Sequence, residues 1–154
     1  MEFSDLLKPE AVKVLSAVSS KKRLMHDVAD LAEASGEIKA SVAVDALLER
    51  EALGPTGVGK GVALPHARLA GLTAVQGVFI LLETPVNFDA VDRQPVDLVF
   101  GLFAPEDAGV EHLKALALVS RTLRDASICS KLRANPDAAK LHAILTEAQT
   151  TQAA

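Results

Sequence analysis

The sequence has no tryptophan and no tyrosine, and its aromatic rings are five phenylalanines. Its core must therefore be built mainly from Val, Leu, Ile and Ala. Proteins that bind single-stranded nucleic acid stack bases on exposed aromatic rings, so this absence counts against that class. The formal net charge of −4 and the pI near 5.5 point the same way, because nucleic-acid binding usually requires a basic surface.

Cysteine occurs once, at Cys129, so no disulfide can form within the chain and a reducing compartment is the expected setting. The N-terminal segment carries Glu2 and Asp5 where a signal peptide has basic residues. Long hydrophobic runs are missing as well, and the longest one, residues 98–104, is too short to cross a bilayer. We therefore expect a cytoplasmic protein with no membrane insertion.

What the chain does have is enough length and apolar content for a single globular domain. Its 154 residues are 49% hydrophobic and 23% charged, with no repeat and no linker that would divide them. We expect a domain over residues 1–148 and a flexible tail over residues 149–154.

Hydrophobic periodicity predicts the order strand, two helices, three strands, three helices. The expected elements lie at residues 11–18, 20–36, 39–53, 62–64, 75–88, 95–103, 111–125, 128–132 and from 135 onward. Ser19 or Ser20 is the expected N-cap of the first helix, and Asn135 that of the last, with Pro136 in its first turn. This order indicates an α/β fold, in three α/β/α layers with a mixed sheet.

The stretch from residue 54 to residue 66 reads Gly-Pro-Thr-Gly-Val-Gly-Lys-Gly-Val-Ala-Leu-Pro-His. Glycine lets the backbone approach an anion closely, so we expect the backbone of Gly57, Gly59 and Gly61 to line a phosphate site. Pro65 fixes its own φ and restricts the residue before it, so His66 is held rigidly. A rigid histidine beside such a loop indicates phosphate chemistry.

Residues 54–61 almost match the phosphate loop of nucleotide-binding proteins. The match fails at Gly61, which stands where that motif has the Ser or Thr that binds magnesium. A phosphate loop also follows a strand and opens a helix, whereas this stretch follows a predicted helix and leads into an extended segment. An ATP-dependent enzyme is therefore disfavoured.

Two other residues are candidates for a phosphate site. His112 lies in the first turn of a predicted helix, where free N–H groups favour anions, although alone it is more simply a structural residue. Arg50 ends the second helix and could pair with phosphoryl oxygens, although its spacing alone favours a solvated cation. The His and Cys spacings typical of metal sites are absent, so no metal is expected.

The chain resembles the enzyme IIA components of the phosphoenolpyruvate-dependent phosphotransferase system, in the fructose/mannitol/nitrogen-regulatory family. Within that family it is most similar to the free-standing nitrogen-regulatory members. The resemblance covers nearly the whole chain and is densest at residues 50–51, 56–59, 63–66, 82–92, 94–100 and 112–113.

This resemblance implies that His66 is phosphorylated, through Nε2, and that His112 and Arg50 stabilise the phosphoryl group. It implies a phosphocarrier that needs no cofactor and accepts its phosphoryl group from an HPr-like protein. The phosphorylation state would then decide which regulatory target protein it binds. The alternative is a sugar-specific IIA subunit that passes the phosphoryl group to a IIB partner.

Overall fold

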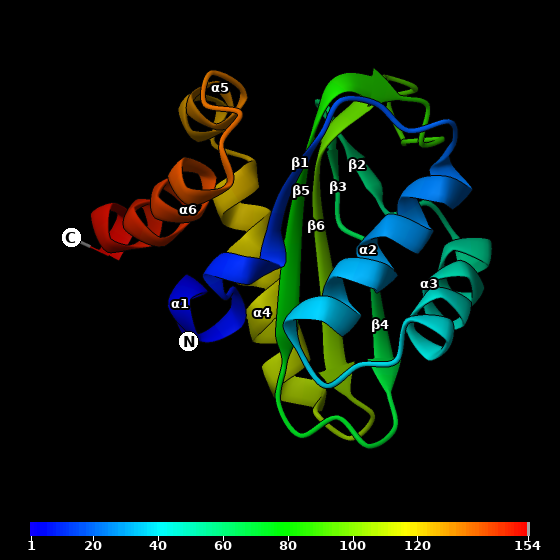
Figure 1. Cartoon of the computed structure of the whole chain (residues 1–154). Coiled ribbons are helices and arrows are strands. Elements are labelled where there is room, and N and C mark those ends of the chain that lie inside the picture. The colour runs from blue at the N-terminus through cyan, green and yellow to red at the C-terminus, as the bar shows by residue number, and fades with distance from the viewer. Residues whose placement is uncertain (154) are drawn as a thin grey trace.

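The computed structural model describes residues 1–153, with side chains as far as Glu147. Within these residues, a mixed sheet of six strands stands between two layers of helices (Figure 1). The predicted three-layer α/β/α class with a mixed sheet is confirmed.

The sheet is built around an antiparallel pair. Its strands are β1 (Val12–Leu15), β2 (Gly57–Gly59), β3 (Val62–Ala63), β4 (His66–Leu69), β5 (Gln76–Val86) and β6 (Val96–Pro105). β5 and β6 pair antiparallel, and β1 adds to β5 in parallel. β3 and β4 both pair in parallel with β6, at residues 98–99 and 102–105 respectively. The two short strands therefore follow one another along the same edge of β6.

Helices cover both faces of this sheet (Figure 1). One layer consists of α2 (Lys21–Ser35) and α3 (Ala40–Leu53); the other contains α1 (Phe3–Leu6), α4 (Gly109–Leu123), α5 (Ala126–Arg133) and α6 (Ala138–Ala153). A 3₁₀ turn, η1 (Pro9–Ala11), leads into β1. α3 packs on β4 and α4 packs on β6, so the two helices approach the β4–β6 edge from opposite faces.

The core lies against both faces of β5 and β6. The near-continuous apolar run predicts a strand buried on both faces, and β6 is buried at every position except Asp97, which is half-buried. All the phenylalanines lie inside with 0% exposure: Phe3, Phe79, Phe88, Phe100 and Phe103. The predicted aliphatic core therefore also holds every large ring that the chain has.

Capping residues set two helix starts, of which one is as predicted. The Ser20 hydroxyl accepts a hydrogen bond from the Arg23 N–H at 3.0 Å, which confirms Ser20 as the N-cap of α2. The prediction of Asn135 as the N-cap of α6 is wrong. The Asp137 carboxylate accepts from the Lys140 N–H at 3.0 Å, whereas the Asn135 amide donates to the carbonyl of Lys131 at the end of α5.

The largest departure from the predicted elements follows α3. The pattern predicts a loop over residues 54–61, but β2 and β3 form a hairpin there. Lys60 and Gly61 make its turn with φ values of 56° and 82°, the positive values that a two-residue turn of this kind needs. Strands of two to four residues leave almost no periodic signal, so pairing along β6 decides the structure here.

The predicted flexible tail lies at the C-terminal end of the chain. α6 continues to Ala153, and Ala154 lies outside the described residues, so the flexible tail over residues 149–154 stays a prediction. No helix within residues 1–153 is long and apolar enough to cross a membrane.

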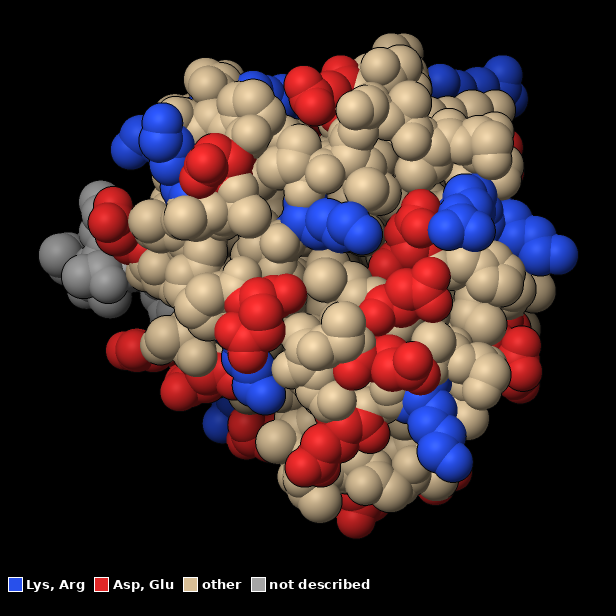
Figure 2. Space-filling view, in the orientation of Figure 1, with Lys and Arg blue, Asp and Glu red and all other residues tan. Residues whose placement is uncertain are grey.

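Acidic side chains gather over α2 and α3 on the face shown in Figure 2, where basic side chains are fewer and scattered. A surface of this sign repels a phosphate backbone rather than attracting it. This face therefore offers no basic footprint of the kind that nucleic-acid binding requires.

Candidate functional site

His66 stands at the break between the two short strands on β6. Pro65 has no N–H to give to the sheet, and its carbonyl accepts from the Leu102 N–H at 2.9 Å. Nδ1 of His66 lies 2.7 Å from the carbonyl oxygen of Leu64. Because a carbonyl oxygen only accepts, Nδ1 carries the proton, and Nε2 of the neutral ring keeps its lone pair.

His112 reaches the same place from the first turn of α4. Its side chain is buried, with 6% exposure, and its Nδ1 lies 3.2 Å from Nε of Arg68. The guanidinium can only donate, so His112 has its proton on Nε2 when neutral. Among the side chains that the structure describes, this Nε2 is one of the few buried polar atoms without a hydrogen-bond partner.

The two rings meet in one open pocket of about 390 Å³. Their centroids lie 5.6 Å apart. The lining residues are Ala46, Glu49, Arg50, Leu53, His66, Ala67, Arg68 and His112. The structure therefore brings together three predicted site residues: Arg50, His66 and His112.

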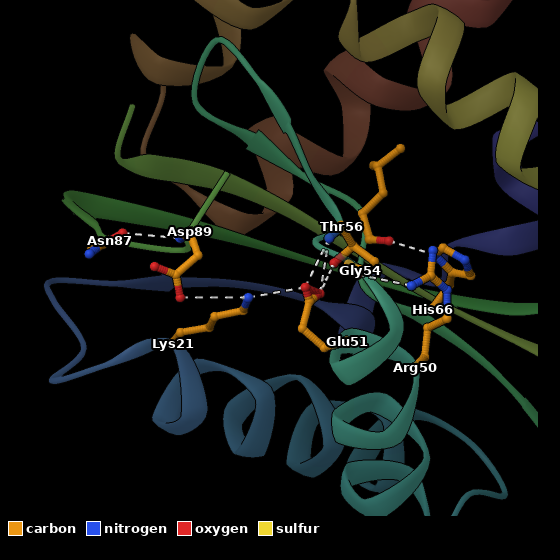
Figure 3. A network of polar contacts seen from close by, with 9 residues as sticks. Lys21, Arg50, Glu51, Gly54, Thr56, His66, Asn87 and Asp89 are labelled. Atoms are coloured by element: carbon orange, nitrogen blue, oxygen red, sulfur yellow. Dashed lines mark hydrogen bonds and ion pairs between the residues drawn. The ribbon is translucent and has the colours of Figure 1, made fainter. Parts of the chain in front are cut away.

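Arg50 enters the pocket from the last turn of α3. Its Nη1 donates to the carbonyl of Gly54 at 2.9 Å, which holds the guanidinium beside His66 (Figure 3). This contact also caps a carbonyl at the end of the helix. The positive charge of Arg50 helps to lower the pKa of His66.

A buried carboxylate ties the end of α3 to the start of the hairpin (Figure 3). Glu51 accepts from the Thr56 N–H at 2.8 Å and from the Thr56 hydroxyl, and it pairs with Lys21 at 3.1 Å. Lys21 also lies 4.0 Å from the carboxylate of Asp89. This network joins α2, α3 and the residues before β2, so it holds the segment that carries Arg50 against the segment that leads to His66.

Both pocket histidines are biased toward the neutral form. Burial is the main cause that lowers the pKa of His66, and Arg50 adds to it, while the contact with Leu64 and the charge of Glu51 act in the opposite direction. Burial also lowers the pKa of His112, helped by His66 and Arg68. At neutral pH the pocket therefore presents one imidazole with a free Nε2 and one with an Nε2–H.

The three glycines named from the sequence lie in or beside the β2–β3 hairpin, outside the lining of this pocket. Gly61 packs against Arg133 and Asp97, and Gly59 faces Asp92. Arg133 donates to the Lys60 carbonyl at 3.0 Å and forms an ion pair with Asp97 at 2.8 Å. A Cβ at Gly61 would lie 2.5 Å from Arg133 and 2.8 Å from Asp97, so a side chain there would have to displace this ion pair.

Arg68 is the pocket residue that sequence reasoning missed. It stands two positions after His66 within β4, and alternate residues of a strand share a face. Reading residues 66–69 as a strand would have placed both side chains on one side. The four-residue length of β4 hides that signal.

Among the described residues, no group of three or more His, Cys, Asp or Glu side chains is arranged to hold a metal ion. The expectation that no metal takes part stays a prediction. The groups that converge are a neutral nucleophile, a neutral donor, two guanidinium groups and the carboxylate of Glu49. The two positive charges exceed the one negative charge, so the arrangement suits an anion that becomes covalently attached to His66.

Comparison with known proteins identifies the family of this chain. The model of the family described as "Phosphoenolpyruvate-dependent sugar phosphotransferase system, EIIA 2" matches residues 5–148. A nitrogen regulatory protein of Bradyrhizobium diazoefficiens is 46% identical over 99% of this chain and 100% of its own length. The nitrogen regulatory protein of Escherichia coli is 40% identical over 98% of this chain and 93% of its own length.

Among solved structures, the nitrogen regulatory protein IIA-Ntr from Neisseria meningitidis superimposes with a TM-score of 0.87. It is 38% identical, and the match covers 94% of this chain and 99% of that one. The chain therefore belongs to the EIIA 2 family of the phosphoenolpyruvate-dependent phosphotransferase system.

Proposed function

We propose that this protein is a phosphocarrier that accepts a phosphoryl group on Nε2 of His66 from a phosphohistidine of an HPr-like protein. One observation supports this above all others: Nδ1 of each imidazole contacts a group whose hydrogen-bonding role is fixed. The carbonyl of Leu64 only accepts, so the proton of His66 is on Nδ1. The guanidinium of Arg68 only donates, so the proton of neutral His112 is on Nε2. One ring is thus a nucleophile and the other a donor.

The transfer requires no net movement of protons. The lone pair of His66 Nε2 attacks phosphorus while the N–P bond of the donor breaks, and the donor imidazole leaves with the electron pair of that bond. The Nδ1–H of His66 keeps its hydrogen bond to the Leu64 carbonyl throughout. That bond stabilises the positive charge that develops on the ring as the new N–P bond forms.

The two other predicted residues, His112 and Arg50, stabilise the phosphoryl oxygens. The Nε2–H of His112, which has no partner among the described residues, donates to one oxygen, and the guanidinium of Arg50 neutralises charge. Preorganised donors of this kind supply most of what a transfer between two nitrogens needs. We propose no metal and no cofactor for this step.

The full-length similarity to nitrogen regulatory proteins supports a regulatory role, in which the phosphorylation state of His66 selects the target protein that is bound. The family resemblance supports action in the cytoplasm, where the buried thiol of Cys129 stays reduced. Passage of the phosphoryl group to a sugar-specific IIB partner would instead favour the role of an uptake subunit.

The test uses purified enzyme I, an HPr-like carrier and phosphoenolpyruvate. The intact protein should gain one acid-labile phosphate, detected by mass, and His66→Ala should gain none. His26→Ala is the matched control, because His26 lies in α2 outside the pocket. An acid-labile phosphate on folded His66→Ala would contradict the assignment.

A further inference from the structure

The hydrogen bond between Arg68 and His112 has only one possible direction. Nε of Arg68 lies 3.2 Å from Nδ1 of His112. A guanidinium in a protein is always protonated and has no acceptor, so it donates. Nδ1 of His112 must then carry a lone pair, which leaves the single proton of the neutral ring on Nε2.

That second nitrogen is in an unusual position. Nε2 of His112 is buried and makes no hydrogen bond to any described residue. A buried N–H without a partner is costly, and in a native protein it calls for a reason. Its ring faces that of His66 across one pocket, at a centroid distance of 5.6 Å. A phosphoryl oxygen on His66 is a partner of the right charge.

We propose that Arg68 is a positioning residue: it holds His112 in the Nε2–H tautomer, so that His112 presents a donor to the phosphoryl group of His66. This inference rests on the proposed role of His66. Without Arg68, a neutral imidazole is free to populate both tautomers, and the Nδ1–H form would turn a lone pair toward the phosphoryl oxygens. The lone pair on Nε2 of His112 would then repel the lone pairs of the phosphoryl oxygens on His66.

The fold keeps Arg68 in place for this task. It follows His66 by two residues in β4 and pairs in register with Ala104 of β6. Its Nη1 also reaches the carbonyl of Glu106 at 3.5 Å, in the segment that leads into α4. The guanidinium therefore bridges the strand that carries His66 and the approach to the helix that carries His112.

Two substitutions at this position test the donor to Nδ1. Arg68→Lys keeps the charge and a group that donates but cannot accept, so it should favour the same tautomer of His112. In arginine, the fourth atom of the side chain is the donor Nε. In Arg68→Met, the fourth atom is a methyl group, so the donor and the charge are both lost. Arg121→Met, on the exposed side of α4, is the control for the loss of one surface arginine.

The decisive readout is the ¹⁵N NMR spectrum of the His112 ring in the unphosphorylated protein. The native protein and Arg68→Lys should show a protonated Nε2 and an unprotonated Nδ1. Arg68→Met should show a larger fraction of the Nδ1–H form, and Arg121→Met should match the native spectrum. A native His112 protonated on Nδ1, or an Arg68→Met spectrum identical to the native one, would overturn the proposal.

The rate of phosphoryl transfer to His66 supplies the second readout. Arg68→Met should be slower by roughly threefold to tenfold, the loss expected for one hydrogen bond, and Arg68→Lys should keep most of the native rate. If Arg68→Met is slow although its His112 keeps the native tautomer, then Arg68 acts by its charge and not through His112. If the tautomer behaves as expected but His66 acquires no phosphate, the proposed function fails while the positioning role stands.

Discussion

The rings of His66 and His112 meet edge to face, with their planes inclined by 67° and their centroids 5.6 Å apart. They reach this arrangement from the start of β4 and the first turn of α4. Leu64 fixes the protonated nitrogen of one ring and Arg68 that of the other. The pair is therefore asymmetric, although the two side chains are chemically identical.

The first prediction concerns the donor on His112. His112→Phe keeps a ring of similar size and removes the N–H, so transfer to His66 should slow by roughly a hundredfold, the loss typical of one preorganised donor. His112→Gln, whose amide can donate from nearly the same place, should lose less. The measurement is single-turnover transfer from a phosphorylated HPr-like protein, with circular dichroism to verify folding. Equal rates for native protein and His112→Phe would contradict this role.

The second prediction concerns the charge of Arg50. Arg50→Met should raise the pKa of His66, because Arg50 helps to lower it, and should slow transfer by roughly tenfold through the loss of a charge-assisted contact. Arg50→Lys should keep part of both effects. NMR titration of the His66 ring measures the pKa directly. An unchanged pKa in Arg50→Met would show that the guanidinium has no electrostatic effect on His66.

The third prediction is a pH profile. Only the unprotonated Nε2 of His66 can attack, and burial lowers the pKa of His66 below its ordinary value of about 6.5. Besides burial and the contact with Leu64, the charge of Arg50 lowers the pKa of this ring and the charge of Glu51 raises it. The transfer rate should therefore stay level from about pH 8 to about pH 6.5 and fall only in more acidic buffer. A midpoint above about 6.5 would contradict the prediction.

The fourth prediction tests the buried ion pair. Glu51→Gln keeps the shape of the side chain but leaves Lys21 without its buried counter-charge, so the free energy of unfolding should fall by about 1–3 kcal/mol. Asp45→Asn, at an exposed position of the same helix, should change it by less than about 0.5 kcal/mol. Urea unfolding measures both variants. Equal stability of the two would show that the network around Glu51 contributes little.

The fifth prediction compares two glycines with nearly the same φ. Gly61 and Gly71 have φ values of 82° and 84°, but a Cβ at Gly61 would lie 2.5 Å from Arg133, whereas at Gly71 it would meet open space. Alanine should cost about 1–2 kcal/mol at Gly71 and more at Gly61. Folded Gly61→Ala should still accept phosphate, since Gly61 does not line the pocket. Loss of transfer in that variant would restore a role for the hairpin backbone.

The long elements could be predicted from the sequence because their patterns are local. β5 and β6 are apolar runs, α2 to α5 have helical spacing, and the start of α2 has a recognisable cap at Ser20. β2 and β4 could not be predicted in this way, because they are strands only by virtue of what they pair with. The Asp137 cap was also missed, because the amide of Asn135 bonds to the end of α5 and the carboxylate of Asp137 caps α6 instead.

Some residues of the site could likewise be predicted from the sequence, and others could not. His66 stands out from sequence alone, because a proline fixes it at the end of a glycine-rich stretch. His112 and Arg50 rise above ordinary helix-end residues only through the family resemblance, and the structure then places both in the pocket. Arg68 needed the register of β4 on β6. The glycines were expected to line an anion site. Gly61 instead supplies a positive φ in the turn of the hairpin, close to the side chain of Arg133.

The contact between Leu64 and His66 has a consequence for the order of events. With Nδ1 engaged by the carbonyl, the ring offers a single reactive atom, on the side that opens to the pocket. In the proposed function, a protein that gives a phosphoryl group to His66 and one that removes it must therefore approach the same atom along the same path. The donor protein and the acceptor protein cannot both be bound productively at once, so His66 must gain and lose the phosphoryl group in separate binding events. An abundant donor protein would therefore delay transfer of the phosphoryl group to the acceptor.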